Sequence, residues 1–159
     1  QGVFERLNDP LERLLPLVQS STYENNSRFA SRQGEVVLKE NDVLISITDP
    51  KGIIKFANKT FCNIAGYTPE ELLGKPHNIV RHPDMPKLAF QDLWEILKSK
   101  QMWQGYVKNK TKTGGFYWVL ATAFPCLNAS SEISGYISVR FKPPLEAIER
   151  AMQAYKRLP

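Results

Sequence analysis

The chain has 159 residues, of which 42% are hydrophobic, 11% aromatic and 23% charged, and its formal net charge is +5 at pH 7. This length suits one ordinary domain with flanking segments, and the composition is that of a globular protein, which excludes a disordered chain, a collagen and a bare coiled coil. No apolar run approaches the roughly 20 residues of a membrane-spanning helix, and the scattered lysines and arginines argue against a nucleic-acid binder, in which basic residues cluster.

The two cysteines, Cys62 and Cys126, are too few for a disulfide framework or a four-ligand zinc site. We interpret them as reduced thiols of a cytoplasmic domain, since no signal-peptide pattern opens the chain. A metal site is disfavoured because His77 and His82 are the only histidines and no cluster of carboxylates accompanies them at ligand spacing. The chain begins with Gln rather than Met, so we expect it to be part of a longer protein. Whether that protein is anchored to the inner membrane stays open at this point.

Residues 1–34 predict a helical leader followed by a linker. Apolar residues recur there at helical spacing, and prolines at two positions interrupt the pattern. The segment Ser20–Arg32 is rich in Ser and Asn and predicts the linker. The leader either packs on the domain or acts as a signalling or dimerisation element. Its apolar residues are Phe4, Leu7, Leu11, Leu14, Leu15 and Val18.

Residues 35–142 predict the domain proper, which opens with a hairpin. Val43–Thr48 and Ile53–Phe56 predict two strands, joined by a turn at Asp49–Gly52. A short helix is expected to begin at Asn58 and to end before Gly66.

Two more helices follow in the predicted domain. Thr68–Gly74 has a capping threonine, a proline at the first helical position, acids in the first turn and a glycine after the end, which indicates a one-turn helix. Pro86–Lys100 carries apolar residues at helical spacing and predicts a longer amphipathic helix.

The last third of the domain predicts three strands. Trp103–Lys110 and Phe116–Cys126 flank a hairpin turn, and Ile133–Phe141 alternates apolar and polar residues. The order strand-strand-helix-helix-helix-strand-strand-strand indicates an α+β domain with an antiparallel sheet and helices toward one face. Residues 143–159 predict an exit helix, whose narrow apolar stripe packs either on the edge of the sheet or against a copy of itself.

Several specific strings stand within this order of elements. The most specific is Gly74–Pro86, which contains His-Asn-Ile-Val-Arg-His-Pro-Asp-Met-Pro. These strings resemble the PAS sensor domain, and Gly74–Pro86 is similar to the PAS domains of bacterial aerotaxis receptors and related chemotaxis proteins. The resemblance extends from about Glu35 to Pro143. The other strings are Ile47–Gly52, Asn58–Phe61, Gly66–Leu72, Trp103–Asn109, Tyr117–Val119 and Gly135–Arg140.

The resemblance implies a PAS fold, in which a five-stranded antiparallel sheet and short helices surround a ligand cavity, with flanking helices at both ends. In the aerotaxis branch the ligand is FAD, held non-covalently, and the domain is a redox or oxygen sensor of a signal-transduction receptor. FMN and an empty cavity are the alternatives. The resemblance also implies a downstream chemotaxis-type signalling domain and a homodimer formed through the flanking helices.

The first candidate cofactor contacts are Arg81, His82 and Asp84, within the most specific string. These residues stand beside prolines, which limit the backbone and fix where side chains point. Arg and His can donate hydrogen bonds to a phosphate or to flavin carbonyl oxygens, and Asp can accept from ring or ribose donors. Without the resemblance, the same residues indicate an exposed polar loop.

Four further positions complete the candidate set. Asn58 is an N-cap by position, and the resemblance adds a contact to the edge of the flavin ring. Asn109 either points into the cavity or faces solvent from its strand. Trp103 either fills the core or forms a wall beside the flavin or adenine, and Tyr117 is a contact of lower rank.

Other functions have less support in the residues. Haem ligation by His77 or His82 is disfavoured because both lie in the flavin-type string, where they could equally order the loop. The cysteine motif of light-oxygen-voltage domains is absent from the corresponding helix region, since Cys62 lies in an earlier helix. No nucleophile–base pair, phosphate loop or metal motif indicates an enzyme. The main alternative is a ligand-free PAS domain that serves as a dimerisation or signal-relay module.

Overall fold

The computed structural model describes residues 10–11 and 34–159 of the chain. Of the predicted leader and linker, only Pro10, Leu11 and Gly34 belong to this part, so that prediction lies almost entirely outside the described residues. Within the described ranges, no helix combines the length and hydrophobicity that crossing a bilayer requires.

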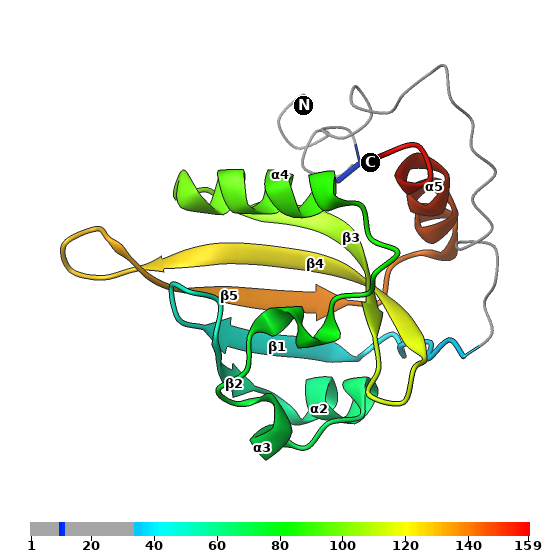
Figure 1. Ribbon diagram of the computed structural model, residues 1–159, viewed down its shortest axis with the longest axis horizontal. Coiled ribbons are helices and arrows are strands. Elements are labelled where there is room, and N and C mark those ends of the chain that lie inside the picture. Colours follow the sequence, from blue (N-terminus) through cyan, green and yellow to red (C-terminus); the bar gives the residue numbers. More distant parts are fainter. Residues whose placement is uncertain (1–9, 12–33) are drawn as a thin grey trace.

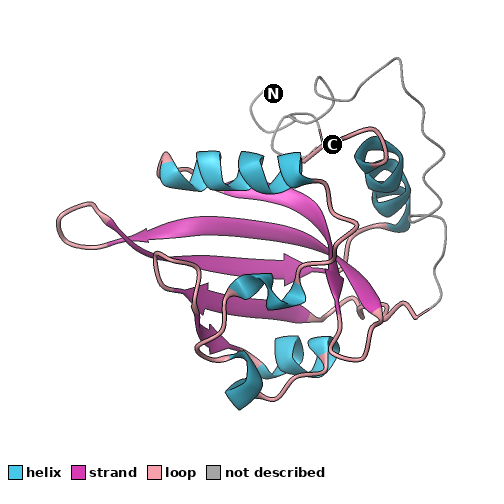
Figure 2. Ribbon diagram, viewed as in Figure 1, coloured by secondary structure: helices cyan, strands magenta, loops and turns pink. Residues whose placement is uncertain are grey.

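A five-stranded antiparallel sheet with strand order β2-β1-β5-β4-β3 forms the centre of the fold (Figure 1). The crossover from β2 to β3 contains the short helices, as Figure 2 shows. The α+β class and the five-stranded sheet are therefore confirmed. The strands are β1 (Val43–Thr48), β2 (Ile54–Ala57), β3 (Trp103–Lys110), β4 (Phe116–Leu127) and β5 (Ile133–Phe141). The helices are α2 (Lys59–Ala65), α3 (Pro69–Leu72), the 3-10 helix η3 (His77–Val80), α4 (Lys87–Lys98) and α5 (Leu145–Tyr155).

Local sequence signals set the ends of the first two crossover helices. The Asn58 side chain accepts a hydrogen bond from the Phe61 backbone N–H at 3.0 Å and so caps α2. Gly66 ends this helix in the left-handed conformation, at φ 81°. Thr68 and Glu71 form the reciprocal capping box that begins α3.

Two of the differences between the predicted and the observed elements lie at the most specific sequence string. β2 is Ile54–Ala57 rather than Ile53–Phe56, because Ile53 forms an isolated bridge with Pro76. His77–Val80 forms a 3-10 helix within the most specific sequence string, where we predicted no element. That helix directs the string back toward the sheet, which matters for the site.

The sheet has an inner face toward α4 and an outer face that carries α5. On β4, Ala121 faces inward, whereas the Trp118 ring stacks on Tyr155 of α5 with centroids 6.2 Å apart. Side chains alternate along a strand, so these residues lie on opposite faces. The exit helix thus packs on its own sheet, which is the first of the two alternatives that the sequence left open.

The docking of α5 predicts a strong effect at Tyr155, which is 0% exposed and donates a hydrogen bond to the Tyr106 carbonyl oxygen at 2.5 Å. Tyr155→Ala should lower the free energy of unfolding by about 3–5 kcal/mol, as for other buried aromatic residues. Tyr155→Phe should lower it by about 1 kcal/mol through loss of the hydrogen bond. Urea denaturation measures both, with exposed Gln153→Ala expected within about 0.5 kcal/mol of wild type. If Tyr155→Ala and Gln153→Ala lowered the free energy of unfolding equally, α5 would not be docked in solution.

Candidate functional site

A cavity of about 160 Å³ lies between the inner face of the sheet and the crossover helices η3 and α4. Its apolar walls come from two directions. Helix α4 contributes the Phe90, Leu93 and Leu97 side chains, and β4 opposes them with the small side chains of Ala121 and Ala123. Because alanines stand where larger residues would fill the core, an apolar slot remains between the helix and the sheet.

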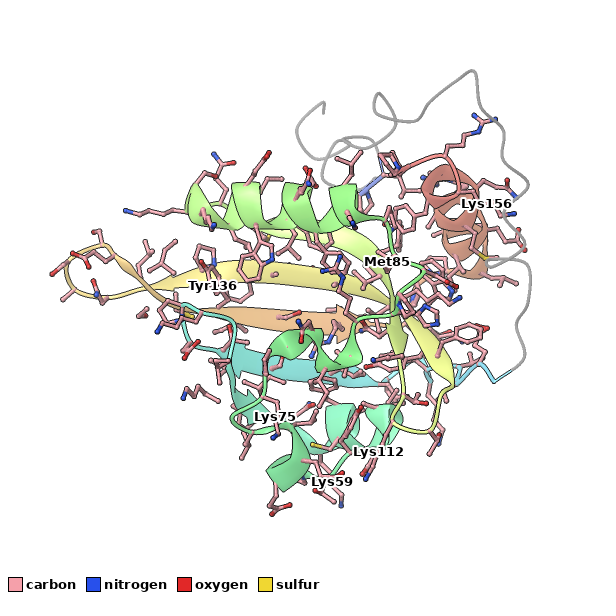
Figure 3. All side chains as sticks on the ribbon, viewed as in Figure 1. Lys59, Lys75, Met85, Lys112, Tyr136 and Lys156 are labelled. Atoms are coloured by element: carbon pink, nitrogen blue, oxygen red, sulfur yellow. The ribbon has the colours of Figure 1, made fainter. Side chains whose placement is uncertain are left out.

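Two aromatic residues stand close together among the lining residues. The Trp94 ring of α4 meets the Tyr136 ring of β5 edge to face, with centroids 5.3 Å apart. Figure 3 shows Tyr136 reaching from the sheet toward α4. Trp94 is 36% exposed, so this part of the lining reaches the surface.

Trp103 forms a fixed part of the wall at the start of β3. Its indole Nε1–H donates to the Asp92 carboxylate at 2.7 Å, and the residue is 1% exposed. The six-membered ring lies over Gly105, where an added Cβ would come within 2.2 Å of a ring carbon. The glycine therefore allows the indole to lie flat along its own strand.

The polar end of the cavity is built around Arg140, which is 2% exposed. Its two terminal nitrogens donate to the hydroxyls of Ser46 and Ser138, each at 2.9 Å. Its guanidinium lies 4.4 Å from the centre of the Phe61 ring. None of the ion pairs formed by the described residues includes Arg140. Burial lowers its pKa to about 10, so it carries its charge at neutral pH.

His77 completes this end of the cavity as a neutral acceptor. Burial and the Arg140 charge lower the pKa of His77 to about 3. Its Nε2 lies 2.9 Å from the Ser46 hydroxyl and 3.3 Å from an Arg140 nitrogen. Because a guanidinium can only donate, Nε2 accepts and the ring proton belongs on Nδ1.

Two buried polar groups at this end have no hydrogen-bond partner among the described residues, the Arg140 Nε–H and the Tyr117 hydroxyl. Burial raises the pKa of Tyr117 to about 12, although the Arg140 charge and the nearby Asn109 side chain oppose the shift. Buried polar atoms without partners are rare in proteins. Of the two residues only Arg140 lines the cavity, so its Nε–H gives this end hydrogen-bonding capacity for a bound polar molecule.

Three of the seven predicted contacts line the cavity: Arg81, Trp103 and Asn109. The Arg81 guanidinium lies 3.8 Å from the centre of the Phe90 ring, and its backbone forms an isolated bridge with Asn109. The helix η3 thus places a second cation on the cavity wall, at a different place from Arg140.

The other four predicted contacts do not lie on the cavity wall, because their side chains are engaged or enclosed elsewhere. Asn58 caps α2 and also bonds the β1 backbone at Ile45 N–H and Val43 C=O. Tyr117 is enclosed on the inner face with 0% exposure.

His82 and Asp84 lie on the far side of the β3 edge from the cavity. Asp84 pairs with Lys108 at 3.0 Å, and the His82 ring meets Phe116 edge to face. Because Lys108 alternates with the cavity-lining Val107 on β3, this pair belongs to the outer face. Direct ligand contact by Asn58, His82, Asp84 and Tyr117 therefore stays a prediction.

The sequence reasoning missed the residues that form the polar end: Ser46, Ser138 and Arg140. It treated His77 as a residue that could order a loop and, with less support, as a haem ligand. The available signal was the polar register of the last strand, since an arginine and a serine alternate there with apolar residues. Nothing local in the sequence shows that this register faces inward.

Comparisons with known proteins agree on the fold. A family profile described as PAS fold matches residues 54–140. The aerotaxis receptor of Escherichia coli is 46% identical over 126 residues, which cover 79% of this chain and 25% of the receptor. The nitrogen fixation regulatory protein of Klebsiella pneumoniae is 30% identical over 65% of this chain and 21% of that protein. This chain therefore spans about a quarter or less of the length of these relatives.

Solved structures with the same fold are more distant in sequence. The light-state LOV domain of the blue-light photoreceptor Aureochrome1 has a TM-score of 0.62 and 19% identity, over 67% of this chain and 86% of that one. A PAS domain from Colwellia psychrerythraea has a TM-score of 0.55 and 21% identity, over 64% of this chain and 86% of that one. At these identities the likeness shows the fold alone.

The neutral state of the half-buried His77 predicts a pH dependence of stability. The unfolded chain binds a proton at this residue below about pH 6.5, whereas the folded chain does so only near pH 3. The unfolded state thus binds more protons between these values, so the free energy of unfolding falls by about 1.4 kcal/mol per pH unit as the pH is lowered through this window. His77→Gln should depend less steeply on pH by that amount in urea denaturation.

His82→Gln is the matched control, because burial lowers the pKa of His82 as well but the nearby Asp84 carboxylate opposes the shift. Its effect on the pH slope should be smaller than that of His77→Gln. Equal slopes for wild type and His77→Gln would show that His77 is not held neutral in solution.

Proposed function

The chain belongs to the PAS fold family, and we propose that it is the FAD-binding redox sensor domain of an aerotaxis-type receptor. The observation that carries the proposal is the cavity, an apolar slot that ends at a buried guanidinium without a carboxylate partner among the described residues. The similarity to the aerotaxis receptor of Escherichia coli supports the sensor role. One solved neighbour, a light-oxygen-voltage domain, is described with a flavin analogue, which supports a flavin as ligand.

The lining residues fit the two ends of a flavin ring. One end of the ring is a dimethylbenzene, which suits the apolar wall of Leu93, Ala121 and Ala123. The other end carries carbonyl oxygens and ring nitrogens, which suit the donors of Arg140 and the amide of Asn109. When bound, the flavin would supply reversible uptake of electrons, which side chains cannot provide.

The choice of FAD over FMN follows the resemblance to the aerotaxis receptors. Arg81 lines the cavity apart from Arg140 and is available to a phosphate group, which both FAD and FMN carry. Haem has less support, because the neutral His77 is already engaged with Ser46 and Arg140. Neither Cys62 nor Cys126 is among the lining residues, so a flavin–cysteine bond is not part of the proposal.

The remaining parts of the proposal concern the longer protein. We place the domain in the cytoplasm of a receptor whose downstream chemotaxis-type signalling domain and membrane anchor lie outside this chain. A homodimer through the flanking helices is included, although the buried residues of α5, such as Ala151 and Tyr155, already pack within the domain. A dimer contact on α5 would therefore use its other face, where Leu145 is 59% exposed. The domain acts as a sensor and not as an enzyme.

The test is flavin binding by the wild-type chain and by a cavity-filling variant. After incubation with FAD and removal of free ligand, wild type should keep the absorbance bands of a bound flavin, whereas parallel incubations with FMN and haem should leave less bound ligand. Ala123→Leu fills the slot from β4 and should weaken FAD binding at least about tenfold, because overpacking a formed cavity forces its walls apart.

The matched control is Thr122→Leu, a similar enlargement at the neighbouring residue, whose side chain points to the outer face. It should bind FAD as wild type does. A wild-type chain that stays colourless after incubation with FAD would contradict the proposed function and would favour the ligand-free relay domain.

A further inference from the structure

We infer that Arg140 is a built-in countercharge for the reduced ligand. Its guanidinium stabilises a flavin ring that has become negatively charged on reduction, and so it sets the potential at which the sensor switches. This inference rests on the proposed function, because it concerns the flavin that the cavity would hold.

The first argument is that Arg140 is a buried charge whose described neighbours are neutral. It is 2% exposed and is surrounded by two serine hydroxyls, a neutral imidazole and the Phe61 ring. Buried charges in proteins are normally paired, because removing an ion from water is costly. Arg140 lines the cavity, so a bound ligand is the group that can supply the missing negative charge.

The second argument is that the guanidinium is held in place with donor capacity left over. Ser46 and Ser138, which fix its two terminal nitrogens, are register partners on the adjacent strands β1 and β5. The Nε–H is buried without a partner. His77 lies beside it as a neutral acceptor and so does not add a second positive charge. The site is therefore arranged before any ligand binds.

The third argument is chemical. Two electrons from an external reductant and one proton from water convert the neutral oxidised flavin ring into a reduced ring with one negative charge. A fixed cation beside the ring interacts more favourably with the charged reduced form than with the neutral oxidised form. That difference in interaction is what allows a ligand state to shift a protein equilibrium.

The experiment measures the midpoint potential of bound FAD by reductive titration with dithionite in the presence of redox dyes. Arg140→Gln should weaken the binding of reduced FAD at least tenfold more than the binding of oxidised FAD, and should show a correspondingly more negative midpoint potential. Arg140→Lys keeps the charge and should restore much of the potential. Lys142→Gln is the control, because it removes a positive charge two residues after Arg140. The Lys142 side chain does not line the cavity and pairs with Glu40, so the potential should stay unchanged.

A measurement on wild type alone keeps the inference testable if the Arg140 variants do not fold. The pH dependence of the potential counts the protons taken up with the two electrons, and wild type should take up one between about pH 6 and 8. A wild-type protein that binds FAD but takes up two protons, or an unchanged potential in Arg140→Gln, would overturn the role of Arg140. A wild-type protein that binds no flavin would instead overturn the proposed function itself.

Discussion

The site depends on one interaction, the pair of hydrogen bonds that hold the Arg140 guanidinium between Ser46 of β1 and Ser138 of β5. These bonds keep a charged group inside the sheet without a carboxylate among the described residues. They also require that β1 and β5 turn serines inward at positions that would otherwise be apolar. The cavity exists because this polar register, together with Ala121 and Ala123 of β4, leaves the centre of the fold without large apolar side chains.

The polar string after η3 has two roles, because it crosses the edge of the sheet at β3. Arg81 stays on the cavity side, whereas Asp84 lies on the other side and pairs with the buried Lys108. The Met85 sulfur accepts a hydrogen bond from the Lys108 backbone N–H at 3.3 Å, and Figure 3 shows Met85 beside this part of the fold. The string therefore covers an edge strand, which in an uncovered sheet would be free to pair with another chain. The residues of this string resemble a single ligand motif in sequence, but in the fold Arg81 lines the cavity whereas Asp84 supports the edge strand β3.

The sequence predicted the elements well because their signals are local. Asn58, Gly66 and the Thr68 capping box act within one helical turn, and the strands follow from alternation and turn residues. The inward direction of each strand was not predictable in the same way. On β5 the apolar register would normally face a core, yet the serine and arginine register lines the cavity. His77 and Arg140 are 63 positions apart, so their contact depends on the tertiary fold.

The position of Arg140 in the chain connects the cavity with the exit helix α5. Phe141, Lys142 and two prolines separate it from α5, and the prolines restrict the backbone between the strand and the helix. α5 in turn is held to the outer face through Tyr155, which stacks on Trp118 of β4. A reduced ligand that draws the guanidinium toward itself would shift the end of β5, to which α5 is joined. Because Tyr155 also holds α5 to Trp118 of β4, a shift of β5 relative to β4 would strain the attachment of the helix. A charge in the cavity could in this way change the position of the exit helix.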